Sequence, residues 1–318
     1  MAVVRDVDSF FRRGSTHKIC EDYAWSGFFN RGGGADDIGR SLVVVSDGCS
    51  TSPFTDFGAR LLVRSLMNRV ASWGEYINME WLIEQAHGLV LSMKMPSDCL
   101  NATLLYALEN NKGDINVGIS GDGMVLAKLR YSGEWKWLDV SFSGNCPAYL
   151  HYLAHYEHLK GFANVVVGNL PTTNGDEDLS TPLGVRYCKG TLVEEIDSIP
   201  EVEDVLCVFR ESDEGDFADF QDRYSLSFTL DSDRYSSVLI ATDGLSSFFT
   251  SGLTRDNLQS LFEDLVIRQV TKIRSFRGEF LQRRMRKFID KYCVDRLITH
   301  SDDVAIAGLF MPKGKSNV

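Results

Sequence analysis

The sequence SLVVVSDGCSTSP, residues 41–53, begins as an apolar run and turns polar at Asp47-Gly48. Its apolar half suits a buried strand, and the aspartate–glycine pair marks the point where that strand ends. The same order returns in SSVLIATDGLSS, residues 236–247, where a second apolar run leads into Asp243-Gly244. Two interpretations fit this repetition. Each pair forms an ordinary turn, or the two carboxylates converge on one binding site.

Outside these two stretches, the chain is dominated by strand-like runs separated by turn sequences such as NNKGD and YSGEW. Consecutive strands joined by tight turns predict antiparallel sheets. The strands are expected at residues 41–46, 103–109, 114–120, 123–131, 135–140, 205–210, 225–230, 236–242 and 303–310. Apolar periodicity predicts helices over residues 54–73, 80–93, 254–270 and 275–292. Helices inserted between antiparallel strands indicate an α+β fold in which helices cover the sheets.

Composition is that of an ordinary globular protein. Of the 318 residues, 44% are hydrophobic and 24% are charged, and no linker or repeat divides the chain. We therefore expect a single domain over residues 1–318, with a flap-like surface insertion at about 150–200. The net charge of −11 argues against a nucleic acid or an anionic membrane as partner.

The cysteines and the apolar runs bear on the cellular compartment. The seven cysteines include no C-x-x-C pair, which argues against a disulfide framework and a thiolate zinc site. The first residues lack the apolar core of a signal peptide, and no apolar run approaches transmembrane length. These features predict a cytoplasmic protein, which we expect to be a monomer.

Acidic residues stand beside many of the expected strands. If these strands are neighbours in stacked sheets, their ends cluster, and the carboxylates repel one another unless cations are bound. Oxygen donors without histidine or cysteine suit Mg²⁺ or Mn²⁺. The candidate ligands are Glu21, Asp22, Asp47, Asp122, Asp243, Asp302 and Asp303.

The order of these motifs resembles that of the metal-dependent protein phosphatases, the type 2C serine/threonine phosphatase family. The motifs are Cys20-Glu21-Asp22, Asp47-Gly48, Gly121-Asp122-Gly123, Ala241-Thr242-Asp243-Gly244 and Asp302-Asp303. The resemblance spans roughly residues 15–310, loosely over 150–235, and is closest to a divergent bacterial branch. It implies a four-layer αββα sandwich, in which two mainly antiparallel sheets pack face to face between pairs of antiparallel helices.

The resemblance also implies a reaction. The family hydrolyses phosphoserine and phosphothreonine on proteins with a dinuclear Mg²⁺ or Mn²⁺ centre and a metal-activated water, without a phosphoenzyme. By this likeness Asp47 would bridge two ions and the Gly48 carbonyl would bind one of them. Asp243 and either Asp302 or Asp303 would hold the other. The remaining roles are those of Glu21 and Asp22, which would act on the first ion largely through water, and of Asp122, which would help to bind a third, weaker ion.

The chain departs from the family pattern where phosphate and protons are handled. The family's usual histidine acid is replaced by Cys49, and its phosphate-binding arginine falls on His17, near Arg13. Cys49 is then either a thiol acid or a small packed residue. His17 and Arg13 either bind phosphate or lie on the surface. Ser247 stands at a position where many members carry an aspartate. An alternative function is therefore a weak or inactive pseudophosphatase that serves as a regulatory binding module.

Three further hypotheses have weaker support. The first is a metal-dependent nuclease, which would also use clustered carboxylates, but the acidic net charge of the chain argues against it. The run HYLAHYEH, residues 151–158, has histidine spacings that could bind zinc, although a solvated helix face is the simpler interpretation. The basic segment 268–291 is expected to be an exposed face with its own salt bridges, and a docking surface is the minority hypothesis.

Overall fold

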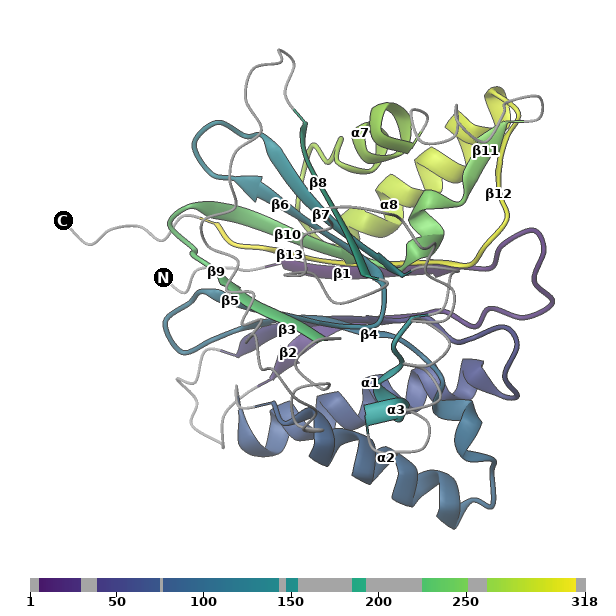
Figure 1. Ribbon diagram of the computed structural model, residues 1–318. Coiled ribbons are helices and arrows are strands. Elements are labelled where there is room, and N and C mark those ends of the chain that lie inside the picture. Colours follow the sequence, from purple (N-terminus) through teal and green to yellow (C-terminus); the bar gives the residue numbers. More distant parts are fainter. Residues whose placement is uncertain are drawn as a thin grey trace, which may run out of the picture.

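Two antiparallel β-sheets packed face to face form the centre of the molecule, and helices cover the outer face of each sheet (Figure 1). This computed structural model describes residues 6–29, 39–74, 77–142, 147–153, 185–192, 225–250 and 262–312. The arrangement confirms the expected α+β sandwich of four layers. No helix within these ranges is long and apolar enough to cross a membrane.

Every pairing within the sheets is antiparallel. In spatial order, the six-stranded sheet consists of β1 (Asp6–Arg12), β13 (Val304–Phe310), β10 (Tyr235–Ala241), β6 (Gly123–Leu129), β7 (Trp135–Phe142) and β8 (Val185–Leu192). The five-stranded sheet consists of β2 (Tyr23–Phe29), β3 (Arg40–Ser46), β4 (Leu104–Glu109), β5 (Ile115–Ser120) and β9 (Ser225–Leu230). A short ribbon joins β11 (Phe248–Thr250) to β12 (Ile298–His300).

The helices fall into two groups on opposite sides of the sandwich (Figure 1). The five-stranded sheet carries α1 (Thr55–Trp73), α2 (Met79–Ser92) and the 3₁₀ turn η1 (Ser97–Leu100), with α3 (Leu150–Leu153) beside them. The six-stranded sheet carries η4 (Phe262–Ile267), α7 (Arg268–Val270), α8 (Phe280–Arg286) and η5 (Lys287–Cys293). The 3₁₀ turn η3 (Asp243–Ser246) directly follows β10.

The apolar runs of the sequence reflect strands that are buried on both faces. In β3, Val43 and Val45 face the other sheet, whereas Leu42 and Val44 pack against the helices α1 and α2. A strand between two apolar layers needs hydrophobic residues at every position, so the alternation of a half-exposed strand is lost. This explains why residues 42–45 are continuously apolar.

Strand β1 and helix α8 depend on each other, although they lie at opposite ends of the chain. Asp8 is buried in β1, and its Oδ2 accepts hydrogen bonds from the backbone N–H groups of Leu281 (2.6 Å) and Gln282 (3.0 Å). No side chain next to α8 in the sequence caps its N-terminus. Asp8 therefore satisfies the first amide donors of a helix some 270 residues away.

Most of the expected elements are present, and the differences have physical causes. The structure adds β1, β2, β11 and β12. Charged residues interrupt β1, and β11 and β12 have only three residues each, so these three carry little strand pattern. Strand β8 pairs with β7 inside the range expected to be an insertion. The expected strand at 205–210, the first part of the helix at 254–270 and most of the range 150–200 lie outside the described residues. His151 is buried rather than on a solvated helix face.

Two glycines, one on α1 and one on α2, provide a test of how closely α1 packs against η1. A Cβ added to Gly58 would lie 1.6 Å from the Cys99 carbonyl oxygen, whereas a Cβ added to Gly88 on α2 would meet nothing within 4 Å. We expect Gly58→Ala to lower the free energy of unfolding by about 1–3 kcal/mol or more, because backbone must move. Gly88→Ala should raise it by about 0.5–1 kcal/mol, since alanine favours the helix.

Urea denaturation of both variants and the wild type measures these changes. Gly88→Ala is the matched control, because it makes the same substitution in a helix on the same side of the sandwich. Equal stability of Gly58→Ala and the wild type would show that α1 does not approach η1 as closely as described.

Candidate metal centre

Four aspartates from both sheets meet at the strand ends. Asp47 follows β3 and Asp22 precedes β2, so both belong to the five-stranded sheet, while Asp243 follows β10 and Asp122 precedes β6 in the other. The side chains of Asp22 and Asp47 lie close enough for each to alter the pKa of the other, and the charge of Asp243 raises the pKa of both. Asp122 interacts with the charge of Asp243 in the same way. We call these four residues the aspartate cluster.

Burial and mutual repulsion change the acidity of the aspartate cluster. Burial, followed by the charges of neighbouring carboxylates, raises the pKa of Asp22 to about 7 and that of Asp243 to about 7. The same causes hold the pKa of Asp47 and that of Asp122 well above the ordinary range. Ionised together, these side chains are costly to bury, so the cluster requires protons or a cation to balance its charge.

Hydroxyl groups fix two of the acidic side chains. The Thr242 Oγ1 donates to Asp22 Oδ2 at 2.6 Å and accepts the Ala305 N–H at 3.0 Å, which links the two sheets. The Thr55 Oγ1, at the start of α1, donates a hydrogen bond to Glu21 Oε1 at 3.2 Å. These contacts hold the carboxylates in place before any ligand arrives.

The backbone around Asp47-Gly48 is held by the segment that precedes β4. The Asp47 N–H donates to Thr103 Oγ1 at 3.0 Å, and the Thr103 N–H donates to the Asp47 carbonyl at 2.8 Å. Gly48 is buried and pairs with Ala102 in an isolated bridge. The strand end is therefore rigid, and the conformation of the Gly48 carbonyl is defined by tertiary contacts.

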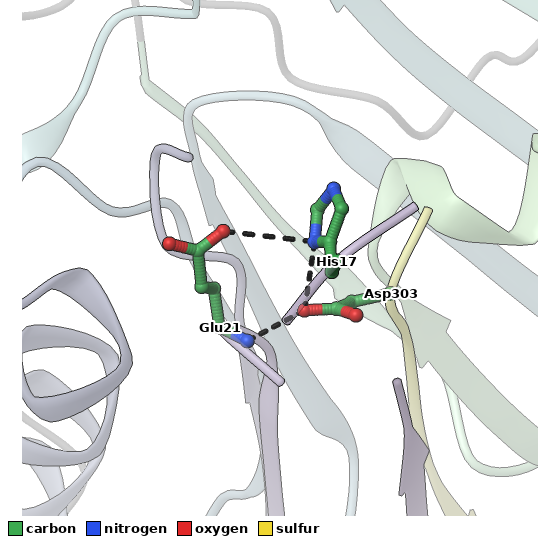
Figure 2. A group of neighbouring side chains, drawn as sticks. All are labelled: His17, Glu21 and Asp303. Atoms are coloured by element: carbon green, nitrogen blue, oxygen red, sulfur yellow. Dashed lines mark hydrogen bonds and ion pairs between the residues drawn. The ribbon is translucent and has the colours of Figure 1, made fainter. Parts of the chain in front are cut away.

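A second group of side chains lies beside the aspartate cluster and contains a histidine. His17, Glu21 and Asp303 offer ligand atoms that all lie within 4.8 Å of one another (Figure 2). The His17 Nδ1 is 3.2 Å from Asp303 Oδ2 and 3.6 Å from Glu21 Oε2, and its Nε2 is 3.3 Å from Asp302 Oδ1. We call His17, Glu21 and Asp303 the histidine group. This group therefore adds a histidine nitrogen to the oxygen donors that the sequence analysis named.

Asp303 is anchored more firmly than Asp302. The Asp303 side chain is 1% exposed, and its two oxygens accept the N–H groups of Gly14 (2.7 Å) and Glu21 (2.5 Å). The Asp302 side chain is 39% exposed and lies at the rim. Gly244 packs directly on this turn, since a Cβ there would come within 1.5 Å of the Asp303 carbonyl oxygen.

The candidate residues for phosphate and proton handling take different positions. Arg13 is exposed, and its guanidinium donates to the Lys18 carbonyl at 3.0 Å. Cys49 is half-buried, with its Sγ 3.1 Å from Thr51 Oγ1. Burial would raise the pKa of the Cys49 thiol, but hydrogen bonds, first that of Thr51 and then that of Tyr149, outweigh it and lower the pKa.

One carboxylate near the site was missed by the sequence analysis. Asp139 lies on β7 opposite Met124, burial raises its pKa to about 6, and its charge acts on Asp122 and Asp243. A signal was available. Asp139 occupies the same face of β7 as Trp135 and Trp137, where an apolar residue was expected.

The donor set of the aspartate cluster fits a hard divalent cation. Among the described residues, Oδ1 of the buried Asp122 has no hydrogen-bond partner. Buried polar atoms are normally paired, so an unpaired carboxylate oxygen among other carboxylates is suited to bind a cation. Carboxylate and carbonyl oxygens are the donors that Mg²⁺ and Mn²⁺ prefer.

Comparisons with known proteins give one family and a set of similar structures. The family model described as Protein phosphatase 2C matches residues 20–289. The serine/threonine phosphatase Stp1 from Staphylococcus aureus is 14% identical with a TM-score of 0.50, over 99% of this chain and 97% of that one. The catalytic domain of PstP, in complex with 2 manganese ions, is 12% identical with a TM-score of 0.41, over 97% and 99%. No curated protein matches the chain. At 14% identity, the likeness to Stp1 establishes a shared fold.

The raised pKa values predict how pH affects the metal-free protein. The folded chain holds protons on Asp22 and Asp243 up to a pKa of about 7, whereas the unfolded chain releases them near the ordinary value of 3.8. The folded state therefore binds more protons between about pH 4 and 7, so its stability falls as pH rises through that range. We expect the melting temperature of the chelator-treated protein to fall from pH 5 to pH 8.

A variant isolates the contribution of the aspartate cluster to this trend. Asp122→Asn removes one buried charge, so at pH 8 it should raise the metal-free melting temperature by roughly 2–4 °C per kcal/mol gained and flatten the pH profile. Added Mn²⁺ should stabilise the wild type more at pH 8 than at pH 5. Calorimetry that found the metal-free protein equally stable at both pH values would contradict the described burial of these carboxylates.

Proposed function

Since the chain belongs to the protein phosphatase 2C family, we propose that it is a metal-dependent phosphatase that hydrolyses phosphoserine and phosphothreonine on proteins. The observation that carries this proposal is the aspartate cluster, in which four carboxylates from two sheets, those of Asp22 and Asp122 buried, lie close enough to alter one another's pKa. Cation binding would offset the cost of holding these acids together.

The proposed ligands divide between the two groups of side chains. In this proposal Asp47 would hold both ions, the Gly48 carbonyl would bind one of them, and Asp243 would bind the other together with a carboxylate of the turn that holds Asp302 and Asp303. Glu21 and Asp22 would act largely through water, and Asp122 would contribute to a third, weaker position. When bound, the ions would supply an acidified water to attack phosphorus and positive charge to neutralise the phosphoryl oxygens.

The residues of the chain would position these groups and handle the proton. Thr242 holds Asp22, and Thr55 holds Glu21, so both acids are oriented in advance. The departing serine or threonine oxygen needs a proton, and Cys49, one residue beyond Gly48, is the candidate donor through its Sγ–H. Arg13 is directed to the Lys18 carbonyl, so phosphate binding by Arg13 would require its guanidinium to leave that partner.

The further properties follow from the same proposal. The substrate is a phosphoprotein, and the net charge of −11 disfavours nucleic acid. We propose that the whole chain acts as one domain, as a monomer in the cytoplasm. Strand β8 and the remainder of 150–200 would then border the site and influence which phosphoproteins enter.

An inactive binding module remains the second candidate function, because three specific positions favour it. Cys49, His17 and Ser247 stand where the family commonly uses histidine, arginine and aspartate. A protein of this kind would bind a cation or a phosphoprotein without turnover. The aspartate cluster favours the enzyme, since buried charges that serve no reaction are costly to retain.

Hydrolysis of p-nitrophenyl phosphate and of a phosphothreonine peptide with Mn²⁺ tests the proposal. We expect turnover by the wild type and a fall in kcat of about 10²–10³-fold in Asp47→Asn and in Asp243→Asn, because each loses a cation ligand worth several kcal/mol in the transition state. Asp295→Asn, which makes the same substitution at an exposed position outside the aspartate cluster, is the matched control and should keep wild-type activity.

The outcome separates the two functions. Mn²⁺ binding by calorimetry with no hydrolysis of either substrate would favour the inactive module. Full activity in Asp47→Asn would remove the metal-dependent mechanism altogether.

A further inference from the structure

We propose that His17 is a metal ligand, and that the histidine group forms a mixed nitrogen–oxygen cation position that prefers Mn²⁺ over Mg²⁺. The donors are His17 Nδ1, Glu21 Oε2 and Asp303 Oδ2 (Figure 2). This inference rests on the proposed function, because it specifies one cation position of the same site, at which Glu21 would bind the ion directly instead of through water. It also decides between the two aspartates of the final turn by assigning the ligand role at this position to Asp303.

The spacing of the three donors suits a single ion. Two ligands bound at about 2.0–2.2 Å on neighbouring coordination positions lie roughly 3–3.5 Å apart. The His17 Nδ1 is 3.2 Å from Asp303 Oδ2 and 3.6 Å from Glu21 Oε2. An ion placed among these atoms would reach all three with only small shifts of the side chains.

The two ring nitrogens of His17 are placed differently. The Nδ1 atom is buried and makes no aligned hydrogen bond within the described residues, although two carboxylates face it. The Nε2 atom lies 3.3 Å from Asp302 Oδ1. Metal-binding histidines commonly donate the N–H of one ring nitrogen to a carboxylate, which leaves the lone pair of the other for the ion. Asp302 would thus orient the ring, with Nε2 protonated and Nδ1 free to bind.

The carboxylates of this group are held ready for the ion. Asp303 is fixed by the N–H groups of Gly14 and Glu21, and the Glu21 side chain receives the hydroxyl of Thr55. A carboxylate oxygen has two lone pairs, so Asp303 Oδ2 can accept the Glu21 N–H and still bind a cation. All three donors are at most one-fifth exposed, with side-chain exposures of 19%, 13% and 1%.

An imidazole donor changes which ion the position selects. Mg²⁺ demands oxygen ligands and dehydrates reluctantly, whereas imidazole nitrogen suits the first-row transition metals. A site made of carboxylates alone would discriminate less between Mg²⁺ and Mn²⁺. The competing interpretation is that His17 is a protonated counter-ion that pairs with the surrounding carboxylates and leaves as an ion binds.

Pulsed electron paramagnetic resonance of bound Mn²⁺ separates these interpretations without reference to activity. In the metal-ligand case, the full chain loaded with Mn²⁺ should show modulation from a directly bound nitrogen, and labelling the protein with ¹⁵N-histidine should change its frequency. His17→Gln should lose the modulation. His87→Gln, which removes an imidazole from α2, is the matched control and should keep it. Absence of nitrogen modulation in the wild type, or its persistence in His17→Gln, overturns the proposal.

Titration calorimetry with each metal alone gives a second measurement. We expect His17→Gln to weaken Mn²⁺ binding by about 10–100-fold and Mg²⁺ binding by less than about threefold. His17→Ala with added free imidazole should recover part of the Mn²⁺ affinity. If His17→Gln weakens both ions equally, or if it tightens binding as loss of a counter-ion would, the proposal is wrong.

Failure of this inference can be distinguished from failure of the proposed function. Hydrolysis of p-nitrophenyl phosphate that depends on Asp47, together with Mn²⁺ spectra free of nitrogen, would leave the phosphatase intact and remove the histidine ligand. Nitrogen modulation without hydrolysis under any metal would retain the ligand and remove the enzyme.

Discussion

Repulsion between buried carboxylates is the constraint around which this fold is arranged. Asp22, Asp47, Asp122 and Asp243 are held together although burial and the charges of nearby carboxylates raise the pKa of each. The apolar layer between the two sheets, with Val43 and Val45 at its centre, supplies the packing that offsets this repulsion. A sandwich suits the task because each sheet delivers its own strand ends to the same edge, and neither sheet alone would assemble the cluster.

The hydrogen bonds between the sheets show how tightly the site is tied to the fold. Thr242 joins the loop before β2 to the end of β10, and Asp303 joins the end of the six-stranded sheet to the segment that contains Gly14 and Glu21. Movement of one sheet against the other would separate the ligands of both groups. The distances between the candidate ligands therefore depend on how the two sheets pack against each other.

Sequence alone predicted the strand-end aspartates, because an apolar run that stops on Asp-Gly leaves a recognisable pattern at residues 41–53 and 236–247. It did not predict β1, since the charge of Asp8 hides the strand, and only the tertiary contact with α8 makes that burial favourable. Asp139 was not predicted as a site residue for a similar reason, because it is a single acidic residue within the expected strand and does not stand at its end. The position of His17 depends on the path of a loop, for which the sequence offers no periodic signal.

The pairing of β1 with β13 places the earliest and the latest described strands side by side. Of the described strands, β1 is synthesised first and β13 last, so the six-stranded sheet stays open until β13 has left the ribosome. Asp303 directly precedes β13 and is made together with it. A chain interrupted before β13 would thus lack both the strand that closes this sheet and part of the candidate metal centre, exposing the apolar faces of β1 and β10 to chaperones or aggregation.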